Sequence, residues 1–196
     1  MRRIPISIKN IKSSGRTFHH IVFNRKISEK AKIKQFSTTN IEFEVLSEPA
    51  PGNPFHLAIP VHNISIARQF YGNLLGLKEG RRAADDKWQD YSMNGHQIVC
   101  HYVGENYRCI DYYNPVDGDE VPVPHFGIIL SEIEFLKLAE KLNHENINYI
   151  VPPHKRFIDQ PGEQWTMFFK DPSGNNLEFK ALTNPNYLFA KYSVKT

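Results

Sequence analysis

The stretch Gln164–Lys180 reads QWTMFFKDPSGNNLEFK and predicts two strands joined by a tight turn. Strand-forming aromatic residues fill Trp165–Phe169, and a second strand-like run follows at Leu177–Leu182. Between them Asp171–Gly174 supplies a proline that presets φ, a glycine that tolerates positive φ and an aspartate that can bond the backbone just ahead. Glu178 stands out, because an unpaired carboxylate in a dry core is costly. We expect Glu178 to face water, a cation or a metal, and a solvated strand face is the simplest alternative.

This hairpin closes the second of two copies of the same βαβββ order, which is an internal repeat. The first copy has a strand at 55–61, a helix that Gly76 can end, and strands near 78–82, 88–93 and 96–103. The second copy has a strand at 125–130, a helix, and strands at 148–151, 165–169 and 177–182. The predicted fold class is therefore α+β.

Local signals support these elements. Asn63 is a plausible N-cap for the first helix, whose buried face is expected to carry Ile66, Phe70 and Leu74. Ser131 and Glu134 have the spacing of a capping box at the start of the second helix. The pair Asn94-Gly95 is a strong hairpin signal between two strands of the first copy.

The repeats divide the chain into segments. Residues 55–183 form the predicted domain, with a first module at 55–103 and a second at 125–183. Residues 41–54 are a proline-rich connector that follows a strand-like run at 41–46, and residues 184–196 are a C-terminal extension. The linker at 104–124 is long for a structureless loop, which suggests a lid or a wall of a site.

The formal charge of +3 conceals two very different parts. Residues 1–40 hold ten Lys and Arg but one acid, Glu29, which gives a net charge of +9. The remaining 14 basic and 20 acidic residues give residues 41–196 a net charge of −6. A basic segment rich in Ser and Thr is typical of a transit peptide, so we expect a mitochondrial protein, with a plastid or cytoplasmic location as alternatives. A disordered basic arm that binds nucleic acid or acidic lipid is the competing interpretation.

Composition argues against several classes of protein. The sequence contains no apolar run long enough to cross a membrane and no phosphate-binding glycine loop. Two cysteines, Cys100 and Cys109, are too few for a disulfide scaffold or a cysteine-rich zinc site. Because the acidic body has no basic face, we expect neither nucleic acid nor a membrane as a partner.

The repeat also brings chemistry-bearing residues into equivalent positions. An offset of 69 residues aligns His56 with His125 on the first strands of the two modules. For the last strands, an offset of 77 aligns His101 with Glu178, whereas an offset of 79 aligns Val99 with it. Both offsets keep the same strand face, because side chains alternate with period two. Imidazoles and a carboxylate together suit iron, zinc, manganese, nickel or cobalt.

At this point the sequence resembles the vicinal oxygen chelate superfamily, which includes glyoxalase I, extradiol dioxygenases and bleomycin-resistance proteins. The likeness covers about residues 55–182 and rests on FHLAIPV, RQFYGNLLGL and DPSGNNLEF. The stretch VPVPHFG resembles an uncharacterised glyoxalase-like or dioxygenase-like branch. The resemblance implies paired βαβββ modules that form a half-barrel around one metal.

The resemblance also implies a ligand set. His56, His125 and Glu178 match the family's ligand positions, and Glu178 is also the candidate catalytic residue. Glyoxalases commonly place Glu or Gln at the fourth position, where this sequence offers His101 or Gln97. Two histidines and one carboxylate resemble the facial triad of iron oxygenases, whereas four ligands resemble an isomerase or a transferase.

Two further residues are candidates for substrate binding. Arg156 is suited to hold an anionic group through a charge-assisted fork, and a solvated sheet edge is an equally good interpretation. Tyr113, in the linker, is expected either to line the pocket or to pack against the sheet.

The sequence thus predicts a metal-dependent enzyme of glyoxalase or dioxygenase type that acts on a small oxygen-rich metabolite. The alternative from another class is a metal-free small-molecule binding protein of bleomycin-resistance type, and a third interpretation makes the histidines satisfied core groups. A homodimer is expected as a possible assembly, since dimers are common among relatives.

Overall fold

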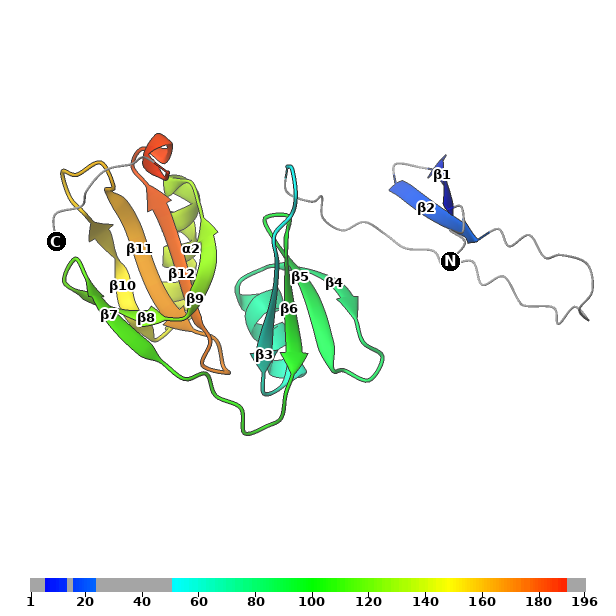
Figure 1. Cartoon of the computed structure of the whole chain (residues 1–196), viewed down its shortest axis with the longest axis horizontal. Helices are drawn as coiled ribbons and strands as arrows, with labels where there is room; N and C mark the ends of the chain where they lie inside the picture. The colour runs from blue at the N-terminus through cyan, green and yellow to red at the C-terminus, as the bar shows by residue number, and fades with distance from the viewer. Residues whose placement is uncertain (1–5, 14–15, 24–50, 190–196) are drawn as a thin grey trace, which may run out of the picture. The chain divides into compact units, whose positions relative to one another are not determined.

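The computed structural model describes residues 6–13, 16–23 and 51–189, which belong to two compact units, Met1–Glu48 and Pro49–Thr196 (Figure 1). In the first unit, β1 (Ile6–Ser13) pairs antiparallel with β2 (Arg16–Phe23). This hairpin lies inside the basic segment at residues 1–40, for which no strand is predicted from the sequence. The strand-like run predicted at 41–46 lies outside the described residues.

The second unit begins with the first βαβββ module, which is confirmed. Its elements are β3 (His56–Val61), α1 (Ile64–Ala67), η1 (Arg68–Leu74), β4 (Lys78–Arg82), β5 (Trp88–Met93) and β6 (His96–Tyr102). The strand order is β3-β6-β5-β4, with β3 parallel to β6 and the other pairs antiparallel. In the β5–β6 turn, Asn94 and Gly95 both have positive φ, 49° and 84°, as the Asn-Gly pair predicts.

The second module is confirmed as well. It consists of β9 (His125–Ile129), α2 (Glu132–His144), β10 (Tyr149–Arg156), β11 (Gln164–Lys170) and β12 (Asn176–Leu182), in the strand order β10-β11-β12-β9. β9 is parallel to β12. Ser131 and Glu134 form the predicted capping box at the start of α2. β10 runs further than predicted, and the prolines Pro152 and Pro153 are tolerated because this strand lies at the sheet edge, where the register shifts.

The first helix differs from the prediction in its buried face. Asn63 caps it as expected, since its Oδ1 accepts a hydrogen bond from the Ile66 amide at 3.0 Å. Ile66 itself is exposed, so its assignment to the core is wrong; the buried positions are Ile64, Ala67, Phe70 and Tyr71. From Arg68 the helix continues as the π-helix η1, whose wider turn shifts the buried face away from simple four-residue spacing.

The linker at 104–124 contains a hairpin that is not predicted from the sequence. β7 (Tyr112–Val116) and β8 (Asp119–Val123) pair antiparallel across a turn at Asp117-Gly118. Asp117 and Gly118 both have positive φ, 49° and 87°. An Asp-Gly pair between strand formers is a hairpin signal, but prolines in both strands conceal it, and a short two-stranded ribbon tolerates them.

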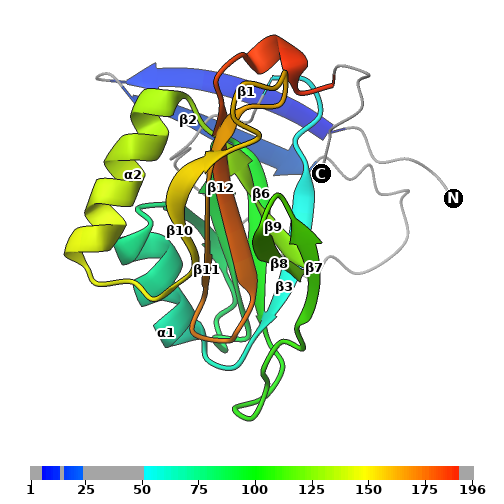
Figure 2. The same cartoon turned by 90° about the vertical axis from the view of Figure 1, so that its left-hand side faces the viewer.

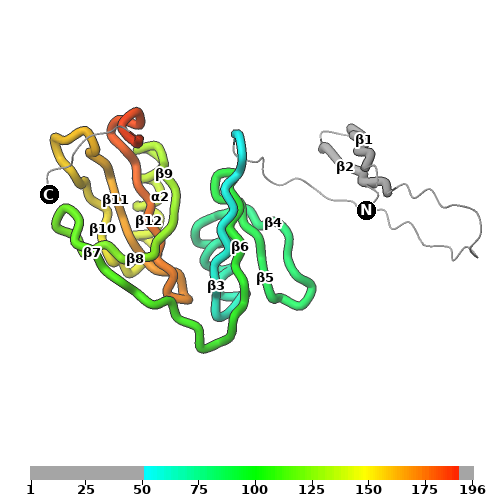
Figure 3. The backbone as a smooth tube through the Cα atoms, viewed as in Figure 1, coloured from blue at the N-terminus to red at the C-terminus, as the bar shows by residue number. Residues whose placement is uncertain are grey.

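Helices pack on one face of the two sheets, and the β7–β8 hairpin packs on the opposite face of the second sheet. α1 and α2 cover the same side of both sheets (Figure 2). The linker runs from β6 to β9 and joins the two modules (Figure 3). The main core on the helix side draws on both modules and includes Ile59, Val61, Phe70, Phe135, Met167, Phe169 and Leu177. On the opposite face of the second sheet, Val121 of β8 packs with Val151 and Phe168. The β7–β8 hairpin therefore covers part of that open face.

The turn between β11 and β12 connects the two modules. The Tyr71 hydroxyl of η1 donates a hydrogen bond to Asp171 Oδ2 at 2.8 Å, and Asn175 Nδ2 donates to the Pro60 carbonyl of β3 at 2.9 Å. The His62 amide donates to Ser173 Oγ at 3.0 Å. Residues of the first module thus bind directly to the β11–β12 turn of the second module. Among the described residues, no helix has the length and hydrophobicity needed to cross a membrane.

Candidate functional site

His125 and Glu178 meet on the open face of the second sheet. In the parallel pair of β9 and β12, Gly127 lies opposite Glu178, two residues beyond His125. His125 Nε2 lies 3.4 Å from Glu178 Oε2. A Cβ at Gly127 would lie 1.6 Å from the Glu178 carbonyl oxygen, so the two strands can approach this closely because residue 127 is glycine. The structure therefore brings together two residues that the sequence places on separate strands.

Glu178 is buried but surrounded by donors. Its side chain accepts a hydrogen bond from the Thr166 hydroxyl at 3.0 Å and lies 3.4 Å from Lys180 Nζ. Burial alone would raise the pKa of Glu178, but the contact with His125 and the charge of Lys180 outweigh burial and lower it. The carboxylate is therefore ionised at neutral pH, as a metal ligand or a base requires.

The ring of His125 is held by a backbone partner. Its Nδ1 donates a hydrogen bond to the Pro122 carbonyl at 2.7 Å, since a carbonyl can only accept. Phe168 packs edge-on against the ring, with centroids 5.2 Å apart. The bond with Glu178 raises the pKa of His125, burial opposes this, and the Pro122 carbonyl adds to the rise. Nε2 is the ring nitrogen that faces Glu178.

His56 occupies the equivalent position in the first module. It is the first residue of β3 and pairs with Gln97 of β6, just as His125 pairs with Asn176 of β12. His56 Nδ1 lies 2.7 Å from Gln97 Oε1. Gln97 Nε2 in turn donates to Asp90 Oδ2 at 2.8 Å. Gln97, considered above as a ligand, therefore lies between His56 and a buried carboxylate.

The strand register decides which residue corresponds to Glu178. Since His56 pairs with Gln97 and His125 pairs with Asn176, the two modules superpose with the offset of 79 on their last strands. This offset aligns Glu178 with Val99, which is buried. His101 lies two residues further along β6, opposite Pro60 of β3, and is exposed. The register thus places an aliphatic side chain, Val99, at the position equivalent to Glu178.

Arg156 is placed differently from the expectation for a substrate-binding residue. Its side chain is 3% exposed and lies at the end of β10, under the β7–β8 hairpin. Nη2 donates a hydrogen bond to the Val116 carbonyl at 2.8 Å, and Nε lies 3.4 Å from Asp119 Oδ2. His154 Nε2 lies 3.2 Å from the same carboxylate. These contacts favour a role in holding the hairpin over a role in binding substrate.

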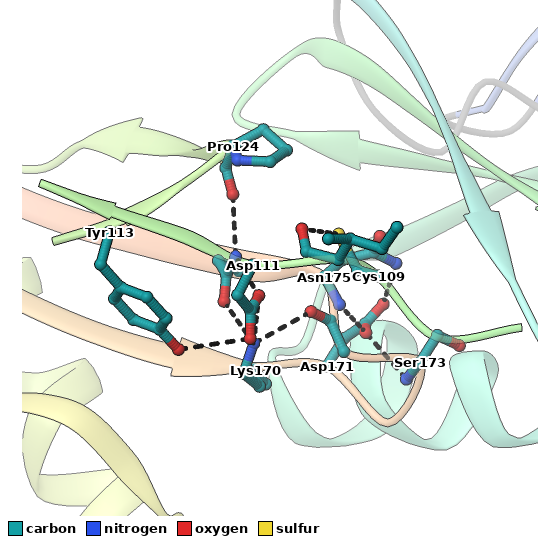
Figure 4. Close-up of polar contacts among 11 residues, drawn as sticks. Cys109, Asp111, Tyr113, Pro124, Lys170, Asp171, Ser173 and Asn175 are labelled. Carbon is teal, nitrogen blue, oxygen red and sulfur yellow. Dashed lines mark hydrogen bonds and ion pairs between the residues drawn. The ribbon is translucent and has the colours of Figure 1, made fainter.

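Tyr113 belongs to a polar network that anchors the linker (Figure 4). Its hydroxyl donates a hydrogen bond to Asp111 Oδ2 at 3.2 Å, and Lys170 Nζ lies 2.6 Å from the same oxygen. Asn176 Nδ2 donates to Asp111 Oδ1 at 3.1 Å and to the Pro124 carbonyl at 2.9 Å. The network ties the start of β7 to the second sheet, next to His125.

This anchoring predicts a pH-dependent contribution to stability. Burial raises the pKa of Asp111, but the bonds from Lys170 and Asn176 outweigh it, so the net pKa is lowered. A lowered pKa means that the stabilisation is complete above the unfolded pKa, about 3.9, and is lost as pH falls through the folded pKa. Replacing Asp111 with Asn should therefore cost about 1 kcal/mol at neutral pH, and the cost should shrink below about pH 4.

Urea unfolding of the wild type and the Asp111→Asn variant across this pH range measures the difference. Asp159→Asn, in the loop between β10 and β11, is the control and should leave the free energy of unfolding within about 0.5 kcal/mol of the wild type. A difference that grew as the pH fell, or that vanished already between pH 8 and 6, would contradict the assignment.

Sequence reasoning missed three residues of the site: Asp90, Thr166 and Lys180. Lys180 had a signal, because it lies two residues after Glu178 and period-two alternation places both on one face. Asp90 and Thr166 act across strands, so they depend on the register. Within residues 51–189, no group of three or more His, Cys, Asp or Glu side chains converges closely enough to hold a metal. The described part of one chain thus presents the His125–Glu178 pair in one module and His56 in the other.

A sequence profile of the Glyoxalase/Bleomycin resistance protein/Dioxygenase superfamily matches residues 54–179. The chain therefore belongs to this superfamily, as the resemblance predicted. No curated protein matches the chain.

Solved structures agree with this assignment. A glyoxalase/bleomycin resistance protein/dioxygenase from Alicyclobacillus acidocaldarius is 29% identical, with a TM-score of 0.59 over 71% of this chain and 98% of that one. A glyoxalase/dioxygenase from Nostoc punctiforme is 21% identical, with a TM-score of 0.52 over 72% and 100% of the two chains. A lactoylglutathione lyase from Agrobacterium tumefaciens is 17% identical, with a TM-score of 0.50 over 72% and 98%. The last two comparisons support the fold alone.

Proposed function

We propose that this protein is a divalent-metal-dependent enzyme of glyoxalase or dioxygenase type that acts on a small oxygen-rich metabolite. One observation carries the proposal. Both modules begin with a histidine whose Nδ1 lies against an acceptor oxygen, at 2.7 Å in each case, and His125 also faces the ionised Glu178. A histidine held through one ring nitrogen by an oxygen partner is the usual arrangement of a metal ligand.

The donor set fits a transition metal in its chemistry. Two imidazole nitrogens and one carboxylate oxygen suit iron, zinc, manganese or nickel. A catalytic site needs about three protein ligands, and the described part of one chain gathers two of them, His125 and Glu178. We therefore propose that His56 of a second copy completes the site in a homodimer, because His56 does not converge with His125 and Glu178 within the described part of one chain.

A bound metal would act as a Lewis acid that polarises two neighbouring substrate oxygens. The residues of the chain prepare this chemistry. Thr166 and Lys180 bind the two oxygens of Glu178 and keep the carboxylate ionised and fixed. The Pro122 carbonyl fixes the ring of His125. The β7–β8 hairpin packs on the same face and limits the access of water to Phe168 beside the site.

Metal analysis of the full-length protein, purified without chelator or added metal, tests this function. We expect near-stoichiometric metal in the wild type and a loss of at least about tenfold in the His125→Ala/Glu178→Ala variant, since two ligands are removed. His144→Ala/Glu145→Ala is the matched control, because it removes an exposed His–Glu pair at the end of α2. Iron would direct assays to oxygen uptake, and zinc, nickel or manganese to isomerase or transferase reactions. Equal metal content in all three proteins would overturn the site.

Subunit complementation tests whether the site is shared. His56→Ala and His125→Ala/Glu178→Ala proteins should each lack metal, but a refolded equimolar mixture should recover roughly a quarter of the wild-type sites, because half of the C₂ dimers then contain one intact site. If each site lay within one chain, the mixture would recover nothing.

The metal-free binding protein remains the second candidate. The observation in its favour is that His125, Lys180 and Thr166 satisfy Glu178 without a metal. A protein that is purified metal-free and takes up none on titration would support this function.

A further inference from the structure

We propose that Asp90 and Gln97 are positioning residues that hold His56 in the tautomer with the proton on Nδ1, so that Nε2 offers its lone pair to the metal. The inference rests on the proposed function for the metal, but the tautomer itself can be measured without one. Three side chains form the relay, and each contact determines the next.

Asp90 determines the orientation of the Gln97 side-chain amide. Its side chain is 7% exposed and lies on β5, and Arg81 Nε donates a hydrogen bond to Oδ2 at 3.1 Å. An ionised carboxylate can only accept hydrogen bonds. The group of Gln97 that lies 2.8 Å from the same oxygen is therefore its amide NH₂, which donates.

The oriented amide of Gln97 in turn determines which ring nitrogen of His56 carries the proton. Once the NH₂ group is directed at Asp90, the opposite end of the amide is the oxygen Oε1, which lies 2.7 Å from His56 Nδ1. An amide oxygen accepts, so Nδ1 must carry the proton. Neutral imidazole has one N–H, and Nε2 is left as a lone-pair donor. A reversed amide would place its oxygen against the Asp90 carboxylate, so that two acceptors would face each other with no proton between them.

In the second module, a backbone carbonyl instead of a glutamine accepts the hydrogen bond from Nδ1 of the histidine. At His125 the Pro122 carbonyl takes the place of Gln97, again at 2.7 Å from Nδ1. A backbone carbonyl in one module and a glutamine–aspartate pair in the other thus both require a proton on Nδ1 at equivalent positions, and Nε2 of His125 also lies 3.4 Å from the Glu178 carboxylate. This agreement between unrelated partners is expected if both Nε2 atoms serve one ligand, and a purely structural histidine does not require it.

Nuclear magnetic resonance of the metal-free protein tests the relay directly. Long-range ¹H–¹⁵N correlation spectra of protein labelled at histidine distinguish the two neutral tautomers at about pH 9, well above the ordinary pKa of about 6.5. We expect the Nδ1–H form for His56 in the wild type, assigned with His56→Gln. Gln97→Leu removes the acceptor and should release the tautomer, whereas Gln97→Glu keeps an acceptor oxygen and should retain it. His125 serves as the control within each spectrum and should not change.

Zinc titration of the same proteins separates this inference from the proposed function. Loss of the relay in Gln97→Leu should weaken zinc binding by about 10- to 100-fold, and Gln97→Glu should restore most of it. An Nε2–H tautomer in the wild type, or an unchanged Nδ1–H tautomer in Gln97→Leu, overturns the relay. A tautomer that responds as expected in a protein that binds no zinc overturns the metal function instead. Equal zinc affinity in Gln97→Leu, despite a released tautomer, overturns the positioning role and leaves the metal site.

Discussion

Replacing Gly127 with alanine should destabilise the second unit by about 3 kcal/mol or more, because the new Cβ overlaps backbone atoms that cannot turn away. It would lie 1.6 Å from the carbonyl oxygen of Glu178 and 2.7 Å from the carbonyl carbon. β9 must then move away from β12, which breaks the parallel ladder and separates His125 from Glu178. We expect a lower urea midpoint and, in any protein that still folds, a loss of metal.

Gly72→Ala is the matched control for this prediction. At Gly72 the nearest atom to an added Cβ is Glu79 Oε1 at 2.9 Å, the far end of a flexible side chain. That carboxylate can turn, and alanine favours a helix over glycine, so the free energy of unfolding should change by less than about 1 kcal/mol. If Gly127→Ala were as mild as Gly72→Ala, the close approach of β9 and β12 would be wrong.

Asp171→Ala should cost about 3 kcal/mol or more, because one buried carboxylate serves both modules. Its Oδ1 accepts hydrogen bonds from the amides of Ser173 and Asn175, each at 2.8 Å. Its Oδ2 accepts from the Tyr71 hydroxyl and from Asn175 Nδ2, also at 2.8 Å. Removal leaves four donors without their acceptor and disconnects the β11–β12 turn from η1. Urea unfolding followed by tyrosine and tryptophan fluorescence measures the loss.

Two variants calibrate this result. Tyr71→Phe removes one of the four bonds and should cost about 1 kcal/mol, since burial and Asp171 raise the pKa of Tyr71 and keep its hydroxyl a donor. Asp85→Ala removes an exposed carboxylate 3.7 Å from Lys87 and should stay within about 0.5 kcal/mol of the wild type. An Asp171→Ala variant no less stable than Tyr71→Phe would show that the turn does not hold the modules together.

Much of the fold follows from short-range signals. The order of both modules, the caps at Asn63 and Ser131 and the turn at Asn94-Gly95 are all set by residues within a few positions of one another, and all are confirmed. The β7–β8 hairpin was missed because prolines in its strands outweighed the Asp117-Gly118 signal. The buried face of the first helix was wrong at Ile66, because Ile64 and Ala67 are the residues of α1 that face the core.

The candidate site was predictable only in part. Repetition and alternation were enough to select His56, His125 and Glu178, and two of them do meet. The roles of Gln97 and Arg156 depend on contacts across strands and on the unpredicted hairpin, which no local pattern encodes. The ligand role of all these residues stays a prediction until metal is measured.

The sheet order has a consequence for assembly. β3 and β9 each end a sheet, and among the described residues no further strand pairs with either of them. An uncovered strand edge is a template for pairing with another chain. Isologous pairing closes after two copies, whereas head-to-tail pairing of the same edges continues into an open polymer. Pro60 removes one donor from the edge strand β3, which reduces such growth. The strands that begin with His56 and His125 are thus also sheet edges with which another chain can pair.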